Sequence, residues 1–144
     1  YKRQIKHIRK IMSTLKVDTI QHSSGISTSS TNDIHAGRAK AWVNLNGKGT
    51  ISIRNSFNVS SIADEGTGQY TVNFATAFDN SDYCAGGAVK EFSGNNGTSV
   101  IFMLGKITTV SDGYSTSKIR ASSAAFVNDN FYDSEIVNVY VFDN

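Results

Sequence analysis

The stretch AKAWVNLNGKGTISIRNSFNV, residues 39–59, decides the predicted fold. It holds two strand-like runs rich in β-branched and aromatic residues, and in the second run Ile51 and Ile53 alternate with polar side chains. Alternation with a period of two is typical of a half-buried β-strand. Asn46-Gly47 lies between the runs, and this pair is a strong signal for a hairpin turn. The stretch therefore predicts two antiparallel strands joined by a tight turn.

Similar runs follow toward the C-terminus at spacings of roughly 8–12 residues, as in sandwiches and barrels. The segment DEGTG at residues 64–68 predicts a loop, and Asp112-Gly113 predicts the turn of a second hairpin. Gly86-Gly87 interrupts one run and indicates a bulge or a close approach of another backbone. The expected strands cover residues 39–45, 50–59, 69–76, 83–92, 98–104, 107–110, 114–121 and 135–142.

Composition favours an all-β protein. Of the 144 residues, only three are leucine, 24 are valine or isoleucine, 44 are serine, threonine or asparagine, and none is proline. β-Branched residues fill strands, and serine and asparagine fill turns. We therefore expect an antiparallel β-sandwich or jelly-roll-like knob over residues 39–144. No repeat of fixed period is present, which argues against a propeller or a solenoid.

Charge is divided unevenly along the chain. Residues 1–16 carry six basic side chains and no acidic one, whereas residues 17–144 carry eight basic and twelve acidic side chains. A mildly acidic body argues against nucleic-acid binding. No apolar run is long enough to cross a membrane as a helix, and we expect neither membrane insertion nor a secretory signal peptide.

The basic N-terminal segment has the spacing of a short amphipathic helix over residues 3–16. Its apolar residues recur at intervals of three and four, but a lone helix of this length is marginal in water. A sister chain, the body or a larger assembly must cover the apolar stripe if the helix forms, and the alternative is a solvated basic arm. The predicted anchoring residues are Lys2, Arg3, Ile5, Lys6, Ile8, Arg9, Lys10, Met12 and Leu15.

Residues 17–38 complete the predicted arm. Residues 17–20 (VDTI) are compatible with one short strand, and the Ser/Thr-rich stretch over residues 22–34 has the composition of a flexible linker. It holds too few apolar residues for a core of its own. The sequence therefore divides into an arm over residues 1–38, used for anchoring or oligomerisation, and a body over residues 39–144.

No catalytic or metal-binding motif emerges from the sequence. Cys84 is the only cysteine, and His7, His22 and His35 all precede the body, so a cysteine nucleophile has no evident base. We interpret Cys84 as a small buried hydrophobic residue, and His22 and His35 as solvated or hydrogen-bonded side chains. Acidic residues such as Asp133 lie beside turn residues, where backbone roles compete with calcium binding or glycoside hydrolysis. We expect no enzyme activity, cofactor or metal.

Aromatic and amide side chains gather near predicted turns and strand ends. Such side chains can bind a sugar or a protein surface, because rings stack and amides and acids accept or donate hydrogen bonds to hydroxyls. The alternative is an ordinary edge loop whose aromatic residues pack into the core. The candidate receptor residues are Tyr83, Tyr114, Asn128, Asp129, Asn130, Phe131 and Tyr132.

Three segments resemble a recurrent module of tailed bacteriophages of marine bacteria, including cyanobacteria. They are residues 38–47 (RAKAWVNLNG), 53–62 (IRNSFNVSSI) and 66–74 (GTGQYTVNF). Residues 12–21 (MSTLKVDTIQ) are similar to the start of many such proteins, so the resemblance covers about residues 12–85. The family comprises virion structural and tail-fibre-like proteins.

The resemblance implies a non-enzymatic homotrimer located in the virion. Its arm would attach to a portal, adaptor, capsid or fibre protein, and its β-knob would adhere to a glycan or protein of the host surface. Trp42 and the valine- and isoleucine-rich strands would build either the core or the trimer seam. Two alternatives remain open: a capsid decoration or head-fibre protein, and a free carbohydrate-binding or hydrolytic domain.

Overall fold

The computed structural model describes residues 15–21, 23–25, 28–90, 100–105, 113–125 and 130–143. The chain divides into two compact units, Tyr1–Ile34 and His35–Asn144. The sequence placed this division slightly later, after residue 38. Among the described residues, no helix is both long enough and apolar enough to cross a membrane.

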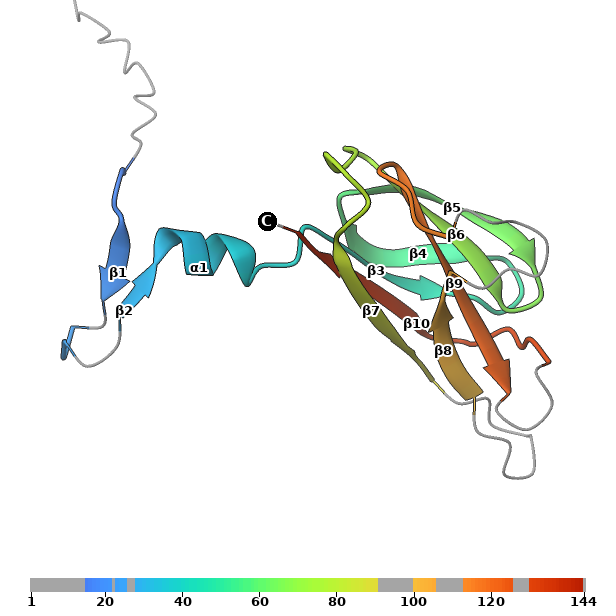
Figure 1. The fold of residues 1–144 in the computed structure, drawn as a ribbon. Coiled ribbons are helices and arrows are strands. Elements are labelled where there is room, and N and C mark those ends of the chain that lie inside the picture. Colours follow the sequence, from blue (N-terminus) through green and yellow to red (C-terminus); the bar gives the residue numbers. More distant parts are fainter. Residues whose placement is uncertain are drawn as a thin grey trace, which may run out of the picture. The chain divides into compact units, whose positions relative to one another are not determined.

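The second unit, which we call the body, contains two four-stranded antiparallel sheets (Figure 1). The first sheet has the order β4-β3-β10-β7, and the second has the order β5-β6-β9-β8. The expected all-β class is thereby confirmed. The first sheet consists of β3 (Ala41–Asn46), β4 (Ser52–Phe57), β7 (Cys84–Val89) and β10 (Val137–Phe142). The second consists of β5 (Val59–Gly66), β6 (Gln69–Phe74), β8 (Val100–Leu104) and β9 (Lys118–Ala125).

The hydrophobic core is built from alternate residues of both sheets. β3 and β10 each bury every second side chain, as a strand with one face on a core does. Each such aliphatic side chain contributes about 1.5–3 kcal/mol when fully buried. The core includes Ala41, Val43, Leu45, Val137, Val139 and Val141 of the first sheet, and Tyr70, Val72, Phe74, Ile119 and Ala121 of the second.

The predicted hairpin over residues 39–59 is confirmed by the pairing of β3 with β4. Trp42 lies opposite Phe57, and a register shift follows Asn44. Asn46 closes the turn, because its side-chain amide donates to the carbonyls of Lys48 (2.7 Å) and Thr50 (3.2 Å). A local sequence signal was sufficient to predict this hairpin, because its two strands and the turn between them are adjacent in the chain.

The Gly86-Gly87 pair reflects close packing and not a bulge. β7 pairs with β10 without interruption, with Gly86 opposite Tyr140 and Gly87 opposite Val139. A Cβ atom on Gly87 would collide with the carbonyl of Asn138 and with the Phe102 ring. Of the two expectations for this pair, the close approach is therefore confirmed.

Three predictions in the body need correction. The strand expected over residues 50–59 is two strands, because β4 ends at Phe57, Asn58 adopts a positive φ of 53° and β5 begins at Val59. No strand was expected over residues 60–66, yet β5 runs through them to Gly66, whose N–H donates to Asp64 Oδ1 at 3.0 Å. The turn is thus confined to Thr67 and Gly68. β9 begins at Lys118 and not at residue 114, since Ser115 Oγ accepts from the Lys118 N–H at 3.2 Å and holds the preceding residues in a turn. The strand expected at residues 107–110 lies outside the described residues.

The first unit, which we call the arm, has regular structure where a flexible linker was expected. β1 (Thr19–Gln21) pairs with β2 (Thr28–Ser30) in an antiparallel hairpin. α1 (Thr31–Ala36) follows directly, and its last two residues belong to the second unit. Ser30 and Asp33 cap the helix reciprocally: the Asp33 N–H donates to Ser30 Oγ at 2.9 Å, and the Ser30 N–H donates to Asp33 Oδ2 at 3.2 Å. The sequence analysis missed this capping pattern because the Ser/Thr-rich composition of the segment predicted a flexible linker.

The helix predicted over residues 3–16 is described only at its end. Leu15 and Lys16 are irregular, and residues 1–14 lie outside the described part of the chain, as do most of the predicted anchoring residues. Leu15, the one anchoring residue that is described, exposes 84% of its surface.

Candidate functional site

Tyr83 belongs to the core, so its assignment to the receptor surface requires correction. It is 6% exposed, and its ring packs against Phe74 and Phe78. Its hydroxyl donates to the carbonyls of Ser115 (3.1 Å) and Lys118 (3.3 Å). Burial raises the pKa of Tyr83 to about 12. The alternative interpretation, an aromatic residue packed inward, describes Tyr83 correctly.

Tyr114 lies on the surface above this buried ring. The Tyr83 and Tyr114 rings stack with centroids 5.4 Å apart, and Tyr114 remains 39% exposed. Desolvation, with a smaller contribution from nearby Cys84, raises the pKa of Tyr114. The exposed part of its ring can still contact a partner.

Asn130, Phe131 and Tyr132 lie at the opposite end of β9 from the tyrosine stack. The Tyr132 N–H donates to the Ser123 carbonyl at 2.9 Å, and the Ala125 N–H donates to the Asn130 carbonyl at 2.8 Å. Tyr114 bridges to Ile119 and Phe131 bridges to Ala124, five residues further along β9, which corresponds to roughly 17 Å of extended strand. The predicted receptor residues therefore form two separate sites and not one patch. Asn128 and Asp129 lie outside the described residues.

A small hollow lies beside Tyr132. It has a volume of about 240 Å³ and is lined by Lys48, Thr67, Tyr132 and Asp133. Gly68 shapes it, because its N–H donates to Asp133 Oδ1 at 2.7 Å and a Cβ there would collide with the Tyr132 backbone. The surface that lines it is mostly apolar, and the four lining residues also carry an ammonium, a hydroxyl, a phenol and a carboxylate that can hydrogen-bond the hydroxyls of a single sugar ring.

The structure corrects the interpretation of Cys84, which is exposed and not buried. It lies opposite Phe142 on the outer face of the first sheet. His35 is also exposed, while His7 and His22 fall in undescribed segments. In the described ranges, no three histidine, cysteine, aspartate or glutamate side chains come together as metal ligands.

The outer face of the first sheet carries an exposed row of aromatic residues that sequence reasoning did not assemble. Phe57, Trp42 and Tyr140 lie side by side on β4, β3 and β10, because Trp42 pairs with both of the others. They expose 53%, 37% and 44% of their surfaces, respectively. Phe142 extends the row, since its ring packs against Tyr140 with centroids 5.9 Å apart. We call these four residues the aromatic strip.

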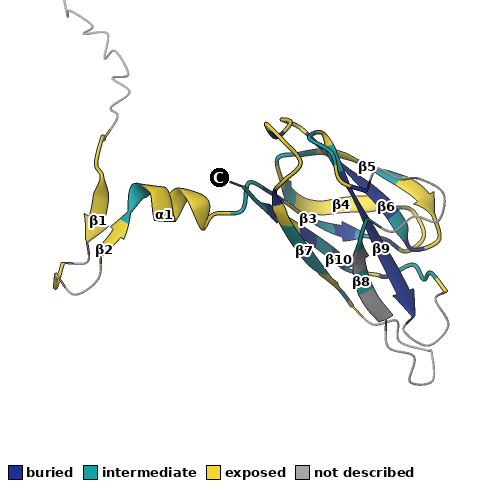
Figure 2. Ribbon diagram, in the orientation of Figure 1, coloured by how far each residue is buried: buried dark blue, intermediate teal, exposed yellow. Residues whose placement is uncertain are grey.

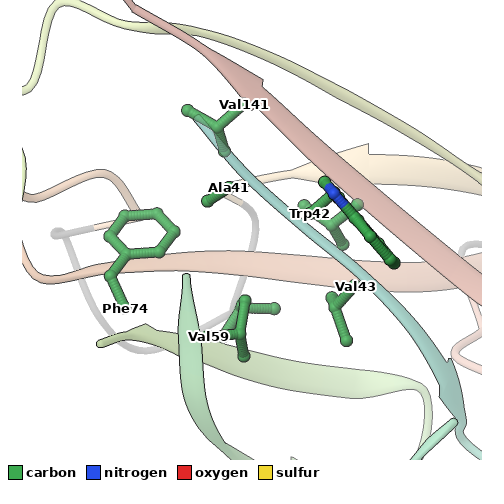
Figure 3. A pocket seen from close by; sticks show the side chains of 8 residues that line it. Ala41, Trp42, Val43, Val59, Phe74 and Val141 are labelled. Atoms are coloured by element: carbon green, nitrogen blue, oxygen red, sulfur yellow. The ribbon is translucent and has the colours of Figure 1, made fainter. Parts of the chain in front are cut away.

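Strand alternation separates the strip from the core. Figure 3 shows Trp42 on the side of β3 away from Val43, Val59 and Phe74, which gather between the sheets. The gap between those inner side chains leaves no room for a water molecule. The strip is therefore an open surface, whereas the space beneath it is packed core.

A row of asparagines lies next to the strip on the same face. Asn44 pairs with Asn55 on one side and with Asn138 on the other, and Asn44 Nδ2 donates to Asn138 Oδ1 at 2.6 Å. The outward positions that follow the strand alternation carry no charged side chain, although the exposed guanidinium of Arg54 reaches this face at Asn46 Oδ1. These positions are Phe57, Asn55, Trp42, Asn44, Asn46, Asn138, Tyr140, Phe142, Cys84, Gly86 and Ala88.

Charged side chains meet at one end of this sheet. Lys90 Nζ and Glu135 Oε2 form an exposed ion pair at 2.7 Å, which lowers the pKa of Glu135. Arg54 donates to the carbonyls of Glu135 (2.6 Å) and Leu45 (3.0 Å) and to Asn46 Oδ1 (3.2 Å). The face thus has an uncharged, partly aromatic centre and a charged border.

The second sheet does not offer a comparable open face over its two central strands. On β6, Thr71 points away from the core yet is 3% exposed, and its hydroxyl donates to Glu65 Oε1 at 2.7 Å. On β9, Ser122 and Ala124 are 0% and 1% exposed. Figure 2 shows this contrast as the buried course of β9 against the exposed course of β4.

Comparison with protein-family models, with curated proteins and with solved structures gave no match.

Proposed function

We propose that this chain is a structural protein of a phage virion: a homotrimeric fibre or tail-appendage knob that attaches to the particle by its arm and adheres to the host surface. The jelly-roll-like connection of its strands and the basic helix over residues 3–16 are part of this proposal. The observation that carries it is the contrast between a body with its own core and an arm in which none of the described residues is buried. The resemblance of residues 12–85 to phage virion modules supports the same assignment.

The arm requires a partner to hold its structure. Among its described residues none is buried, and Leu15, Ile20 and Ile34 expose 84%, 55% and 45% of their surfaces. A hairpin with three residues per strand and a six-residue helix are both too short to be stable alone. A portal, adaptor, capsid or fibre protein would cover these side chains, and acidic patches on it would attract the six basic residues at positions 1–16.

Host adhesion would use the loops at the end of β9. The hollow beside Tyr132 presents Lys48 and Asp133 to solvent, and Asn130 is exposed nearby in sequence. Its volume suits one sugar ring, so we propose a terminal sugar of a host-surface glycan as the ligand, with a surface protein as the alternative. No reaction is proposed for this site.

Electron microscopy of phage particles labelled with antibodies against this chain tests the assignment. Label at the tail or its appendages, in multiples of three copies, is the expected result. Label over the capsid faces or vertices would instead assign the chain to capsid decoration or head fibres, and the absence of label from purified particles would reject a virion role.

A glycan array tests the adhesion site separately. Binding of the native chain should be lost in Tyr132→Ala and kept in Tyr114→Ala, which alters the other end of β9. Turnover of a bound glycan that is lost on replacing Asp129 or Asp133 would overturn the non-enzymatic assignment.

A further inference from the structure

We propose that the aromatic strip is the seam at which three copies of this chain meet, with the outer face of the first sheet turned toward the threefold axis. This inference rests on the proposed homotrimer and specifies the surface that forms it. Sequence reasoning left Trp42 to either the core or a seam, and the structure places it on the exposed face.

The strip has the composition of an interface centre. Tryptophan and tyrosine are the residues that most often dominate binding energy, and they do so where neighbouring contacts exclude water. Phe57, Trp42 and Tyr140 form a continuous row across three paired strands, so a flat partner could cover all three at once. Phe142 lengthens the row along β10.

The absence of charge at the described outward positions favours a second copy as the occupant. A side chain that lies on the threefold axis faces its own copies, so a charged residue at that position would meet like charges. The asparagine row avoids this conflict, because an amide both donates and accepts hydrogen bonds and can therefore pair with another amide. Lys90, Glu135 and Arg54 stay at the border, where interfaces are usually polar and wet.

The size of the face sets how strong the seam can be. Four strands about 4.8 Å apart and six residues of about 3.3 Å each give a face of about 380 Å². A stable interface buries about 800 Å² per partner, so the whole outer face of the first sheet supplies about half of that area. We therefore expect a trimer that dissociates on dilution, with the remaining contacts made outside this face.

Two side chains of the native chain report on whether the seam is covered. Trp42 is the only tryptophan and Cys84 is the only cysteine, and both lie on this face. In the trimer, both acrylamide quenching of Trp42 fluorescence and maleimide labelling of Cys84 should be suppressed. Dilution should restore both together, at the concentration where light scattering shows the mass falling threefold.

Charge insertion tests the same surface by mutation. Tyr140→Lys and Phe57→Lys place a cation in the strip on different strands and should raise the concentration for half-assembly about 30-fold or more, as the loss of an interface hot spot does. Ser61→Lys is the matched control, since it places the same charge on an exposed position of β5 in the second sheet. It should assemble like the native chain.

The outcomes separate this inference from the proposed function. A native trimer in which Trp42 and Cys84 stay accessible, and in which both lysine variants still assemble, would place the seam elsewhere and leave the virion role standing. A native chain that is monomeric at every concentration would overturn the homotrimer and the seam together. A monomer in which an oligosaccharide shields Trp42 would make the strip a glycan platform and overturn the seam. Should a lysine variant fail to fold, the dilution of the native chain decides.

Discussion

The two sheets of the body use the same strand pattern for different purposes. In both, alternate residues face a shared core. In the first sheet the other residues form an open face with an aromatic strip, whereas in the second sheet outward residues of β6 and β9 are buried as well. The comparison teaches that alternation in a strand identifies which residues face the core. It does not show whether the residues on the opposite side are exposed or buried, which depends on what packs there.

The largest expected effect comes from moving a charge from the outer face to the inner face of the same strand. Val139→Asp buries a carboxylate between the sheets and should cost 4 kcal/mol or more, or prevent folding altogether, because about that much is lost when an unpaired charge enters a core. Asn138→Asp, one residue away on the outer face, keeps an oxygen that can accept from Asn44 and should change stability by less than about 0.5 kcal/mol. Urea unfolding at low protein concentration measures both, and equal losses would contradict the assigned faces.

The glycine pair of β7 provides a second comparison between the faces. Gly87→Ala should cost about 2–3 kcal/mol, because its new methyl group would meet the Asn138 backbone and the packed Phe102 ring. Gly86→Ala should cost about 1 kcal/mol or less, since it meets only the Tyr140 ring, which is exposed and can turn aside. Thermal unfolding followed by circular dichroism would reveal the difference, and a greater loss for Gly86→Ala would reverse the inward and outward assignments.

Buried tyrosines should make the body sensitive to high pH. Burial raises the pKa values of Tyr70 and Tyr83 to about 12 from an ordinary value near 10. The unfolded chain loses these protons first, so the stability that they contribute is complete below about pH 10 and is lost as the pH rises through about 12. Urea unfolding between pH 9 and 12 should show this decline, and Tyr83→Phe should flatten it. A stability that stays constant to pH 12 in the native chain would contradict the burial of these hydroxyls.

The smallest expected effect lies at the charged border of the first sheet. Lys90→Ala removes an ion pair whose side chains are 52% and 57% exposed, and we expect no measurable change in the free energy of unfolding. The pKa of Glu135 should rise toward its ordinary value, which a carboxylate titration followed by NMR would detect. A clear loss of stability would show that the border contributes more than a solvated ion pair does.

Much of the body could be predicted because its signals are local. The hairpin over residues 39–59 was evident from Asn46-Gly47 and the flanking alternation, and the Gly86-Gly87 pair indicated a close backbone approach. The arm was harder, because the Ser30–Asp33 capping pair stands in a stretch whose serine and threonine content is typical of a linker. β5 was missed as a separate strand, because only Asn58 separates it from β4 and because it runs into a segment with the composition of a loop.

The candidate sites could be predicted only in part. Tyr83 and Tyr132 were both predicted to belong to the receptor surface, because both lie near predicted turns or strand ends. The structure makes Tyr83 a core residue and places Tyr132 in the lining of an open hollow. The aromatic strip joins residues 42, 57 and 140, and the link to residue 140 is visible only once β10 is known to pair with β3.

Local chemistry in the sequence determined the β class, the main hairpin and the scarcity of apolar residues over residues 17–38, because alternation, turn residues and composition act over a few neighbouring residues. Only the tertiary structure decided which tyrosines are buried, that Cys84 is exposed and that Trp42 belongs to an open aromatic row. The reason is physical: the face that a strand residue occupies follows from pairing register and sheet packing, and both join residues far apart in the chain.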